Sequence, residues 1–200
     1  MTTLPTGAEL RAWLAEPRSG IVKALVQRLG HGRHALPATV ELTRAGGLVG
    51  DRWALVRPKR KAQLTLMDAR VVERLLALSG GTDLDRPGDN LVVDHATSLA
   101  AMPTGMRYRL GGATIELNAL AHLGCAKFEA RFGGAAQAWV NHAEHLDLRL
   151  RGVHATVVRD GVVALGDRLE PLGLAPANLE LFAPDDDADD DDGPSAGAGA

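Results

Sequence analysis

The sequence predicts a mainly β fold of the α+β class, a β-barrel or sandwich with a few short peripheral helices. Most apolar segments are short and end at glycine, proline or aspartate, and several alternate apolar with polar residues, as half-buried strands do. Only a few stretches have helical spacing, and these are short too. With 200 residues and 46% hydrophobic content, the chain has enough apolar material for the core of one domain.

Outside the segment around Cys125, three helices are expected from spacing and end signals. The first covers Glu9 to Ala15, within an N-terminal extension formed by residues 1–19. The second follows Asp68, whose carboxylate can cap it, and stops at Gly80. A third covers Ala135 to His142.

Eight strands are expected between these helices. They cover Ile21–Val26, Thr39–Thr43, Gln63–Leu66, Leu91–Val93, Met106–Leu110, Ala113–Asn118, Val153–Val158 and Val162–Leu165. A two-residue turn at Gly111-Gly112 predicts one β-hairpin, and the turn at residues 159–161 predicts a second. We expect a single domain over residues 20–172, followed by a linker and tail over residues 173–200.

Charge is distributed unevenly along the chain. The net charge is −3, but seven aspartates lie in the tail at Asp185–Asp187 and Asp189–Asp192, so the remainder carries −3 + 7 = +4. A tail of this composition has nothing apolar to bury and is expected to be disordered. The mild basic excess suits an anionic small ligand and is too scattered to predict nucleic-acid binding.

Hydropathy, the N-terminal residues and the number of cysteines indicate where in the cell the protein is located. No apolar run approaches membrane-spanning length, and the first ten residues lack the pattern of a signal peptide. A single cysteine excludes an internal disulfide. We therefore expect a cytoplasmic protein with no membrane partner.

The segment around Cys125 is the strongest candidate for a reactive site. A short helix is expected over residues 125–132, which places the thiol at a helix N-terminus, where backbone N–H groups favour an anion. Lys127 and Arg131 follow it and His122 precedes it, and all three suit an anionic site. The alternative is that Cys125 is a small buried hydrophobe.

Three further patterns have structural and functional interpretations. Asp51 and Arg52, after a glycine-rich turn, form either an ion pair that fixes the turn or part of a site. The basic segment Arg57–Lys61 is interpreted as an exposed loop, with a ligand-binding lid as the alternative. Seven histidines include pairs three residues apart, but no convergent zinc set is visible, and surface positions explain the pairs.

Several motifs, in order, resemble those of the MOSC domain, which is named for the C-terminal part of molybdenum-cofactor sulfurase. The motifs that carry the resemblance are Gly47-Leu48-Val49-Gly50-Asp51-Arg52, Gln63-Leu64-Thr65-Leu66, Gly88-Asp89-Asn90-Leu91, Leu110–Leu117, Gly124-Cys125-Ala126-Lys127-Phe128, Arg151-Gly152-Val153-His154-Ala155 and Gly166-Asp167. The chain resembles a small stand-alone bacterial member. One departure is Trp53, where the family often has histidine.

The resemblance implies a MOSC-type β-barrel and a molybdopterin-type molybdenum cofactor. Cys125 then ligates molybdenum or carries sulfur, in sulfur transfer or in reduction of N-hydroxylated compounds, and His122 orients or protonates the thiol. Arg52, Lys127 and Arg131 supply cations for the cofactor phosphate.

Other implications stay open at this point. Asn90 and Arg151 either touch the cofactor or build the structure. The alternative function is a non-catalytic module that delivers cofactor or sulfur. The partner would be a cysteine desulfurase or a redox protein. Pyridoxal phosphate is not expected, because nothing in the chain resembles the desulfurase domain of the full sulfurase.

Overall fold

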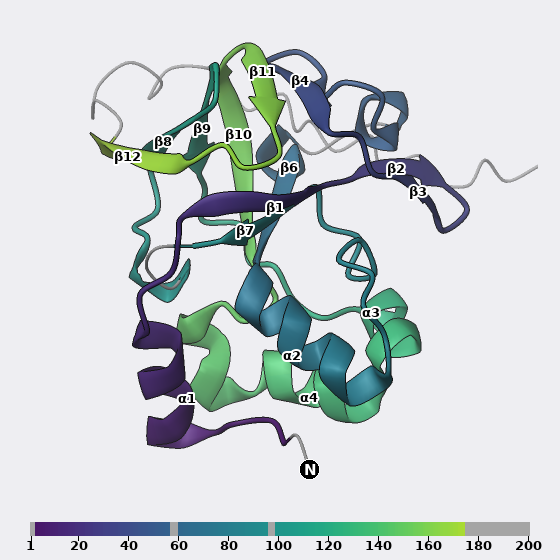
Figure 1. Ribbon diagram of the computed structural model, residues 1–200, viewed down its shortest axis with the longest axis vertical. Helices are drawn as coiled ribbons and strands as arrows, with labels where there is room; N and C mark the ends of the chain where they lie inside the picture. The colour runs from purple at the N-terminus through teal and green to yellow at the C-terminus, as the bar shows by residue number, and fades with distance from the viewer. Residues whose placement is uncertain (1–2, 57–59, 96–98, 175–200) are drawn as a thin grey trace, which may run out of the picture.

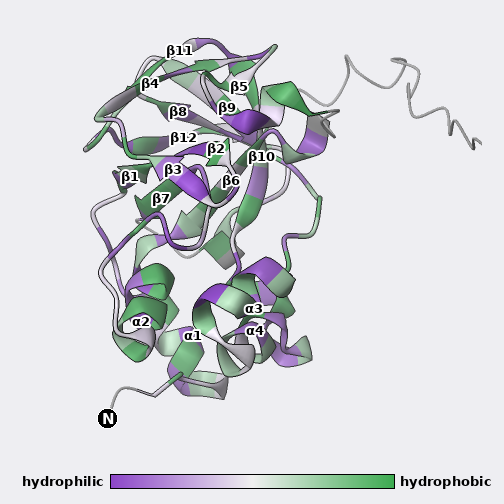
Figure 2. Cartoon of the chain, turned by 90° about the vertical axis from the view of Figure 1, so that its right-hand side faces the viewer, coloured by the Kyte–Doolittle hydropathy of each residue, from purple (hydrophilic) through white to green (hydrophobic). Residues whose placement is uncertain are grey.

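The computed structural model describes residues 3–56, 60–95 and 99–174. Within these ranges the strands gather in one layer and the α-helices in another, as Figures 1 and 2 show from two directions. The acidic tail predicted to be disordered, and most of the basic segment at residues 57–61, lie outside the described residues. Of that segment, Lys61 is described and is exposed.

A curled seven-stranded sheet forms the upper layer. Its strands run in the order β1-β7-β6-β10-β9-β8-β12, and every neighbouring pair is antiparallel except β6 with β7. The bounds are β1 (Ile21–Leu25), β6 (Leu64–Asp68), β7 (Leu91–Asp94), β8 (Met106–Leu110), β9 (Ala113–Leu117), β10 (Val153–Arg159) and β12 (Leu169–Leu174).

The curl brings the two edges of this sheet together. The Val22 N–H donates to the Asp167 carbonyl (2.9 Å), and the Leu169 N–H donates to the Gly20 carbonyl (2.9 Å). Both bonds join β1 to the segment that enters β12. The predicted mainly β, barrel-like α+β fold is therefore confirmed.

Two small sheets complete the strand layer. One contains β11 (Gly161–Ala164), β4 (Thr39–Thr43) and β5 (Gly47–Leu48), in that order. The other is the pair β2 (Gln27–Gly30) and β3 (Arg33–Ala35).

The structure confirms one predicted hairpin and contradicts the other. β8 and β9 pair across Gly111-Gly112; β8 has the predicted bounds, and β9 ends at Leu117, one residue before the predicted end. β10 and β11 are adjacent in sequence, but β11 pairs with β4. The physical reason is that only Asp160 separates the end of β10 at Arg159 from the start of β11 at Gly161, and one residue is shorter than the usual two-residue hairpin turn.

The helices gather at one end of the barrel (Figure 1). They are α1 (Gly7–Ala15), α2 (Ala69–Ser79), α3 (Ala126–Phe132) and α4 (Gly134–Asn141). Short 3-10 segments are η1 (Arg52–Leu55), η2 (Arg60–Ala62), η3 (Leu99–Ala101) and η4 (Ala143–Leu148). The caps predicted for α2 are confirmed: Asp68 accepts from the Arg70 N–H (3.0 Å), and the helix ends at Gly80. None of the described helices is long and apolar enough to cross a bilayer.

Two hydrophobic cores share the central strands. Leu66 of β6 and Leu91 of β7 belong to the core inside the barrel. Their neighbours Met67 and Val92 belong to the core beneath the helices. Because successive side chains of a strand point to opposite faces, β6 and β7 are buried on both sides and show no polar alternation.

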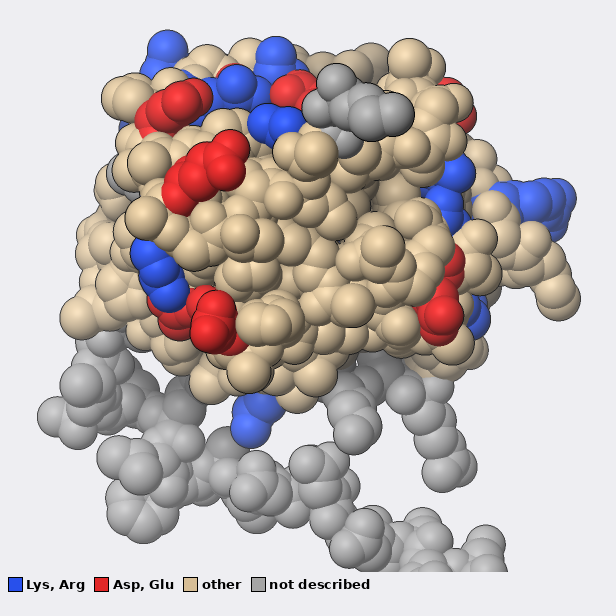
Figure 3. All heavy atoms as spheres, turned by 90° about the horizontal axis from the view of Figure 1, so that it is seen from below, with Lys and Arg blue, Asp and Glu red and all other residues tan. Residues whose placement is uncertain are grey.

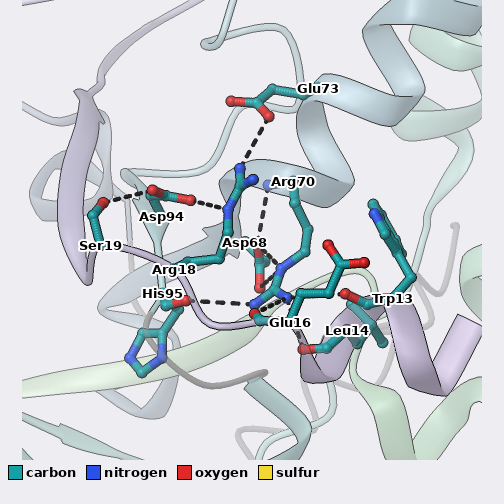
Figure 4. Close-up of polar contacts among 10 residues, drawn as sticks. All are labelled: Trp13, Leu14, Glu16, Arg18, Ser19, Asp68, Arg70, Glu73, Asp94 and His95. Carbon is teal, nitrogen blue, oxygen red and sulfur yellow. Dashed lines mark hydrogen bonds and ion pairs between the residues drawn. The ribbon is translucent and has the colours of Figure 1, made fainter.

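A buried guanidinium joins α1 to the sheet, as Figure 4 shows. Arg70 pairs with Asp68 (3.0 Å), and its Nη1 donates to the carbonyls of Trp13 (3.3 Å), Leu14 (2.7 Å) and Glu16 (3.1 Å) at the end of α1. Carbonyls in the last turn of a helix lack the usual partner four residues on, although that of Trp13 also accepts from the Glu16 N–H (3.4 Å), so Arg70 acts as a tertiary cap. The N-terminal helix is thus packed into the helical layer.

The surface of the helical layer has a mixed charge pattern. Seen from below, charged side chains of both signs lie mostly toward the edge of this face, around an uncharged centre (Figure 3). On the described part of this face, acidic and basic residues lie near one another and form no continuous basic surface.

Candidate functional site

Cys125 lies at the N-terminus of α3, as predicted, and directly precedes the first helical residue. It is the N-cap residue, with extended backbone (φ −94°, ψ 177°), and the helix begins at Ala126. The residue is exposed, so the alternative of a small buried hydrophobe is wrong. Because it is the only cysteine in the chain, any thiol chemistry of this protein belongs to this position.

The surroundings of the thiol lower its pKa. Partial burial acts to raise the pKa, but the backbone N–H groups of Phe128 and Lys127 and the charge of Arg151 together outweigh it. The predicted effect of the helix start is therefore present. The side-chain charge that contributes comes from Arg151, whereas the sequence had pointed to Lys127 and Arg131.

The peptide before Cys125 is held by α4. Asn141 accepts from the Gly124 N–H (2.7 Å) and donates to the Gly124 carbonyl (2.8 Å), and Gln137 donates to the same carbonyl (3.2 Å). A Cβ at Gly124 would lie 2.9 Å from Val140 Cγ2, so glycine permits this close approach. These contacts fix the entry to α3 and with it the direction of the thiol.

A buried ion pair lies beneath α3. Nη1 of Arg151 donates to Oδ2 of Asp89 (2.6 Å), and both side chains are almost completely buried. The guanidinium carbon of Arg151 lies 5.0 Å from the centroid of the Phe128 ring, on the buried side of α3. Arg151 approaches this position because Gly152 follows it: a Cβ there would lie 2.1 Å from the Leu66 carbonyl oxygen.

Two imidazoles adjoin this ion pair. Nδ1 of His122 lies 3.7 Å from Oδ1 of Asp89, and the rings of His122 and His154 are 4.5 Å apart. Burial, opposed by Asp89 and reinforced by Arg151, lowers the pKa of His122 to about 3. Burial also lowers the pKa of His154. Both rings are therefore neutral near neutral pH.

This cluster retains unused polar atoms. Within the described part of the chain, four of its buried atoms have no hydrogen-bond partner: Asp89 Oδ1, His122 Nδ1, Arg151 Nε and His154 Nδ1. Buried polar atoms are normally paired, so such a concentration marks a place where water or a ligand completes the bonding.

Asn90 and Arg52 belong to a neighbouring region. The Asn90 amide is fully buried, donates to Asp51 (3.0 Å) and accepts from the Thr65 N–H (3.2 Å), so its polar atoms have protein partners. Arg52 is exposed at the start of η1. Of the two alternatives for Asp51 and Arg52, the ion pair between them is wrong, because Asp51 pairs with Arg28 (2.8 Å).

Lys127 and Arg131 lie on α3 with the thiol. Lys127 is exposed in the first turn. Arg131, in the last turn, donates to the Pro87 carbonyl (2.7 Å) and so ties α3 to the segment that carries Asp89. The structure thus brings Cys125, His122, Lys127, Arg131 and Arg151 into one region.

Sequence reasoning missed three residues of this region: Asp89, His154 and Asn141. Asp89 and His154 both lie inside motifs that carry the family resemblance. Asp89 directly precedes Asn90, and His154 follows Arg151 by three residues, but only Asn90 and Arg151 were selected as candidates. Asn141 had no signal, because its role depends on how α4 packs beside Gly124.

The histidine pairs have structural roles, and zinc is not indicated. His145 is buried and its Nδ1 lies 2.9 Å from the Trp139 carbonyl, so the expectation that the pairs are surface residues is wrong for it. His34 pairs with Asp85 (2.8 Å). Among the described residues no group of three or more His, Cys, Asp or Glu side chains is arranged to hold a metal ion.

Comparisons with known proteins agree on one family. The family model of the MOSC domain matches residues 59–170, more than half of the chain. A search of curated proteins finds no match.

Solved structures show the same fold. The YuaD protein from Bacillus subtilis shares 15% identity at a TM-score of 0.56, over 76% of this chain and 94% of that one. YiiM from Escherichia coli shares 18% identity at a TM-score of 0.54, over 78% of this chain and 71% of that one. YiiM from Geobacillus stearothermophilus shares 13% identity at a TM-score of 0.51, over 76% of this chain and 73% of that one.

Proposed function

Because the chain belongs to the MOSC domain family, which is associated with binding of the molybdenum cofactor, we propose that it binds a molybdopterin-type cofactor beside Cys125. In this proposal the Cys125 thiolate is the metal ligand or the sulfur carrier. The reaction served is sulfur transfer or reduction of an N-hydroxylated compound.

The observation that carries the proposal is the exposed Cys125 thiol with a lowered pKa at the start of α3. Both roles need a thiolate, and a soft sulfur ligand suits a persulfide as well as molybdenum. A structural cysteine needs neither exposure nor a stabilised anion.

The surrounding residues fit such a group. A bound molybdopterin brings its own sulfur ligands and a phosphate, so it requires one protein thiolate and nearby cations rather than a cluster of protein ligands. Lys127 is exposed next to the thiol, and Arg131 and Arg151 lie behind it. When bound, the cofactor would supply the redox or sulfur chemistry.

The residues of this chain then hold and orient the Cys125 thiolate. Asn141 and Gln137 fix the peptide before Cys125, and Arg151 stabilises the thiolate. His122, neutral near neutral pH, offers an unpaired buried nitrogen and acts as a hydrogen-bonding partner rather than as a charged acid. A cysteine desulfurase or redox protein would supply sulfur or electrons.

The proposal predicts an unusually reactive thiol. The alkylation rate of the native protein, measured against pH with iodoacetamide, should have its midpoint well below the roughly 8.5 of a free thiol. The urea-unfolded chain is the control, and every modification reports on Cys125 because no other cysteine exists.

Replacing Cys125 with Ser should abolish labelling and change the melting temperature little, because the side chain is exposed. A thiol that resists alkylation until the protein unfolds, or one whose midpoint equals that of the unfolded chain, would contradict the proposal.

A further inference from the structure

An open pocket of about 470 Å³ adjoins the segment that leads into Cys125. Its lining comes from residues 118–123, the end of α4 and the segment that runs from η4 into β10. Its volume lies within the range of pockets that bind small organic molecules. Its lining divides into an apolar part and a cationic part.

The apolar part consists of a buried base and an exposed rim. Val140, Leu150 and Val153 are buried and line the pocket. Leu120, Leu123 and Leu146 also line it, and they are 36%, 52% and 49% exposed. Single exposed leucines are ordinary, but three around one pocket offer a surface that an apolar ligand would remove from water.

The cationic part is Arg149. Its Nη1 donates to the Met102 carbonyl (2.8 Å), which is a neutral acceptor. Arg151 also lines the pocket, but Asp89 balances its charge. The described lining contains no aspartate or glutamate, so the charge of Arg149 is not compensated within it.

The backbone at Arg149 supports a role for this side chain. Its φ is 49°, in the left-handed region where glycine sits without strain and arginine does not. From this strained position the side chain bonds the Met102 carbonyl and lines the pocket.

We propose that this pocket binds a small organic monoanion, an apolar ring system bearing one carboxylate, with the ring among the three rim leucines and the carboxylate at Arg149. Charge-assisted bonds to guanidinium groups are among the stronger polar contacts, and the apolar body adds buried area. The proposal that this pocket binds such a ligand depends on the pocket alone and not on the proposed function of Cys125.

The pocket is connected to the thiol through shared residues. Asn141 lines the pocket and holds Gly124, and Leu123 lies two positions before Cys125. Arg151 lines the pocket and lowers the pKa of the thiol. That the pocket holds the substrate of the Cys125 site is a consequence that rests on the proposed function.

Calorimetric titration of the wild-type protein with three probes tests the binding. We expect 2-naphthoate to bind about tenfold more tightly than 2-naphthamide, its uncharged counterpart, because only the former makes a charge-assisted bond. Acetate, which lacks the ring, should show no saturation. Equal affinity for naphthoate and naphthamide, or no saturable binding of naphthoate, would overturn the proposal.

Substitutions locate the bound probe. Arg149→Gln should reduce the affinity for naphthoate about tenfold and leave that for naphthamide unchanged. Leu146→Ser should weaken both, whereas Leu165→Ser, of matched exposure (47% against 49%) but outside the lining, should weaken neither. Equal losses in the two leucine variants would place the probe elsewhere and overturn the proposal.

The Cys125→Ser variant separates the two proposals. Because Cys125 is not part of the pocket lining, the variant should bind naphthoate as the wild type does. Loss of naphthoate binding in this variant would overturn the assignment of the carboxylate to Arg149. A wild-type protein whose thiol is unreactive but which binds naphthoate would refute the proposed function, whereas the proposal for the pocket would stand.

Discussion

The carboxylate of Asp89 lies between two groups that compete for it, the guanidinium of Arg151 and the imidazole of His122. Arg151 is close (2.6 Å) and permanently charged, whereas His122 is farther (3.7 Å) and can lose its proton. Burial acts to raise the pKa of Asp89, but the pKa lies below its usual range, and the charge of Arg151 is the largest effect that opposes burial. Asp89 therefore stays ionised, and His122 stays neutral beside it.

This arrangement predicts that the protein loses stability in mild acid. The pKa of His122 is about 3 in the folded state and returns to about 6.5 on unfolding. Below pH 6.5 the unfolded chain therefore binds more protons, and the free energy of unfolding falls as the pH falls toward 3. His154 adds a change in the same direction. Each imidazole contributes at most about 1.4 kcal/mol per pH unit.

Urea unfolding at about pH 7 and about pH 5 measures this slope. His122→Gln should reduce the slope, and His142→Gln, at an exposed position, should leave it as in the wild type. An unchanged slope in His122→Gln would show that His122 is not kept neutral by the fold.

The residues found from sequence and those missed differ in how local their signals are. The position of Cys125 at a helix start depends on its immediate neighbours, so the sequence predicted it. Asp89 and Arg151 are 62 residues apart, and nothing in either segment names the other as its partner. The same is true of Asp51: an ion pair with the adjacent Arg52 was one of two alternatives, and the structure pairs Asp51 with the distant Arg28.

At the scale of elements, α1 is held in place largely by polar contacts at its end. Only Leu10 and Leu14 are buried along this helix, while Arg70 caps its last carbonyls from α2. Arg18, just beyond α1, pairs with Asp94 of β7 and Glu73 of α2 (Figure 4). The N-terminal segment is thereby attached to both layers.

Removing Arg70 should be strongly destabilising. Arg70→Met keeps the bulk of the side chain but leaves the buried Asp68 carboxylate, whose pKa burial already raises, without its partner. We expect a loss of about 3–5 kcal/mol in the free energy of unfolding. Arg74→Met on the same helix, where the guanidinium bonds the Thr3 carbonyl at an exposed site, is the control. Equal and small losses in both variants would contradict the role given to Arg70.

Element boundaries were more predictable than element partners. Caps and turn residues placed α2 and the β8–β9 hairpin correctly, because these signals act over a few residues. The pairing of β11 with β4 was not predictable in this way. β4 lies more than a hundred residues before β11, and no local signal in either segment names the other as its partner.

At the scale of the molecule, the barrel and the helical layer each contribute residues to the site. The helical layer presents Cys125 on α3, and the strand layer supplies Arg151, at the entry to β10, and Asp89, before β7. Neither layer alone contains the whole region. The ordered motifs nevertheless predicted the fold class, since each marks a segment that the barrel needs.

The central claim is that a molybdopterin-type cofactor binds beside Cys125, and metal content tests it most directly. The protein should be purified from molybdate-supplemented cells that make molybdopterin, and its molybdenum and pterin should be measured per chain for the wild type and for Cys125→Ser. We predict that the wild type retains both. If Cys125 is the metal ligand, the variant loses molybdenum, because serine offers a harder and much less acidic ligand; if Cys125 is the sulfur carrier, the variant keeps it. A wild-type protein without molybdenum and pterin would contradict the account.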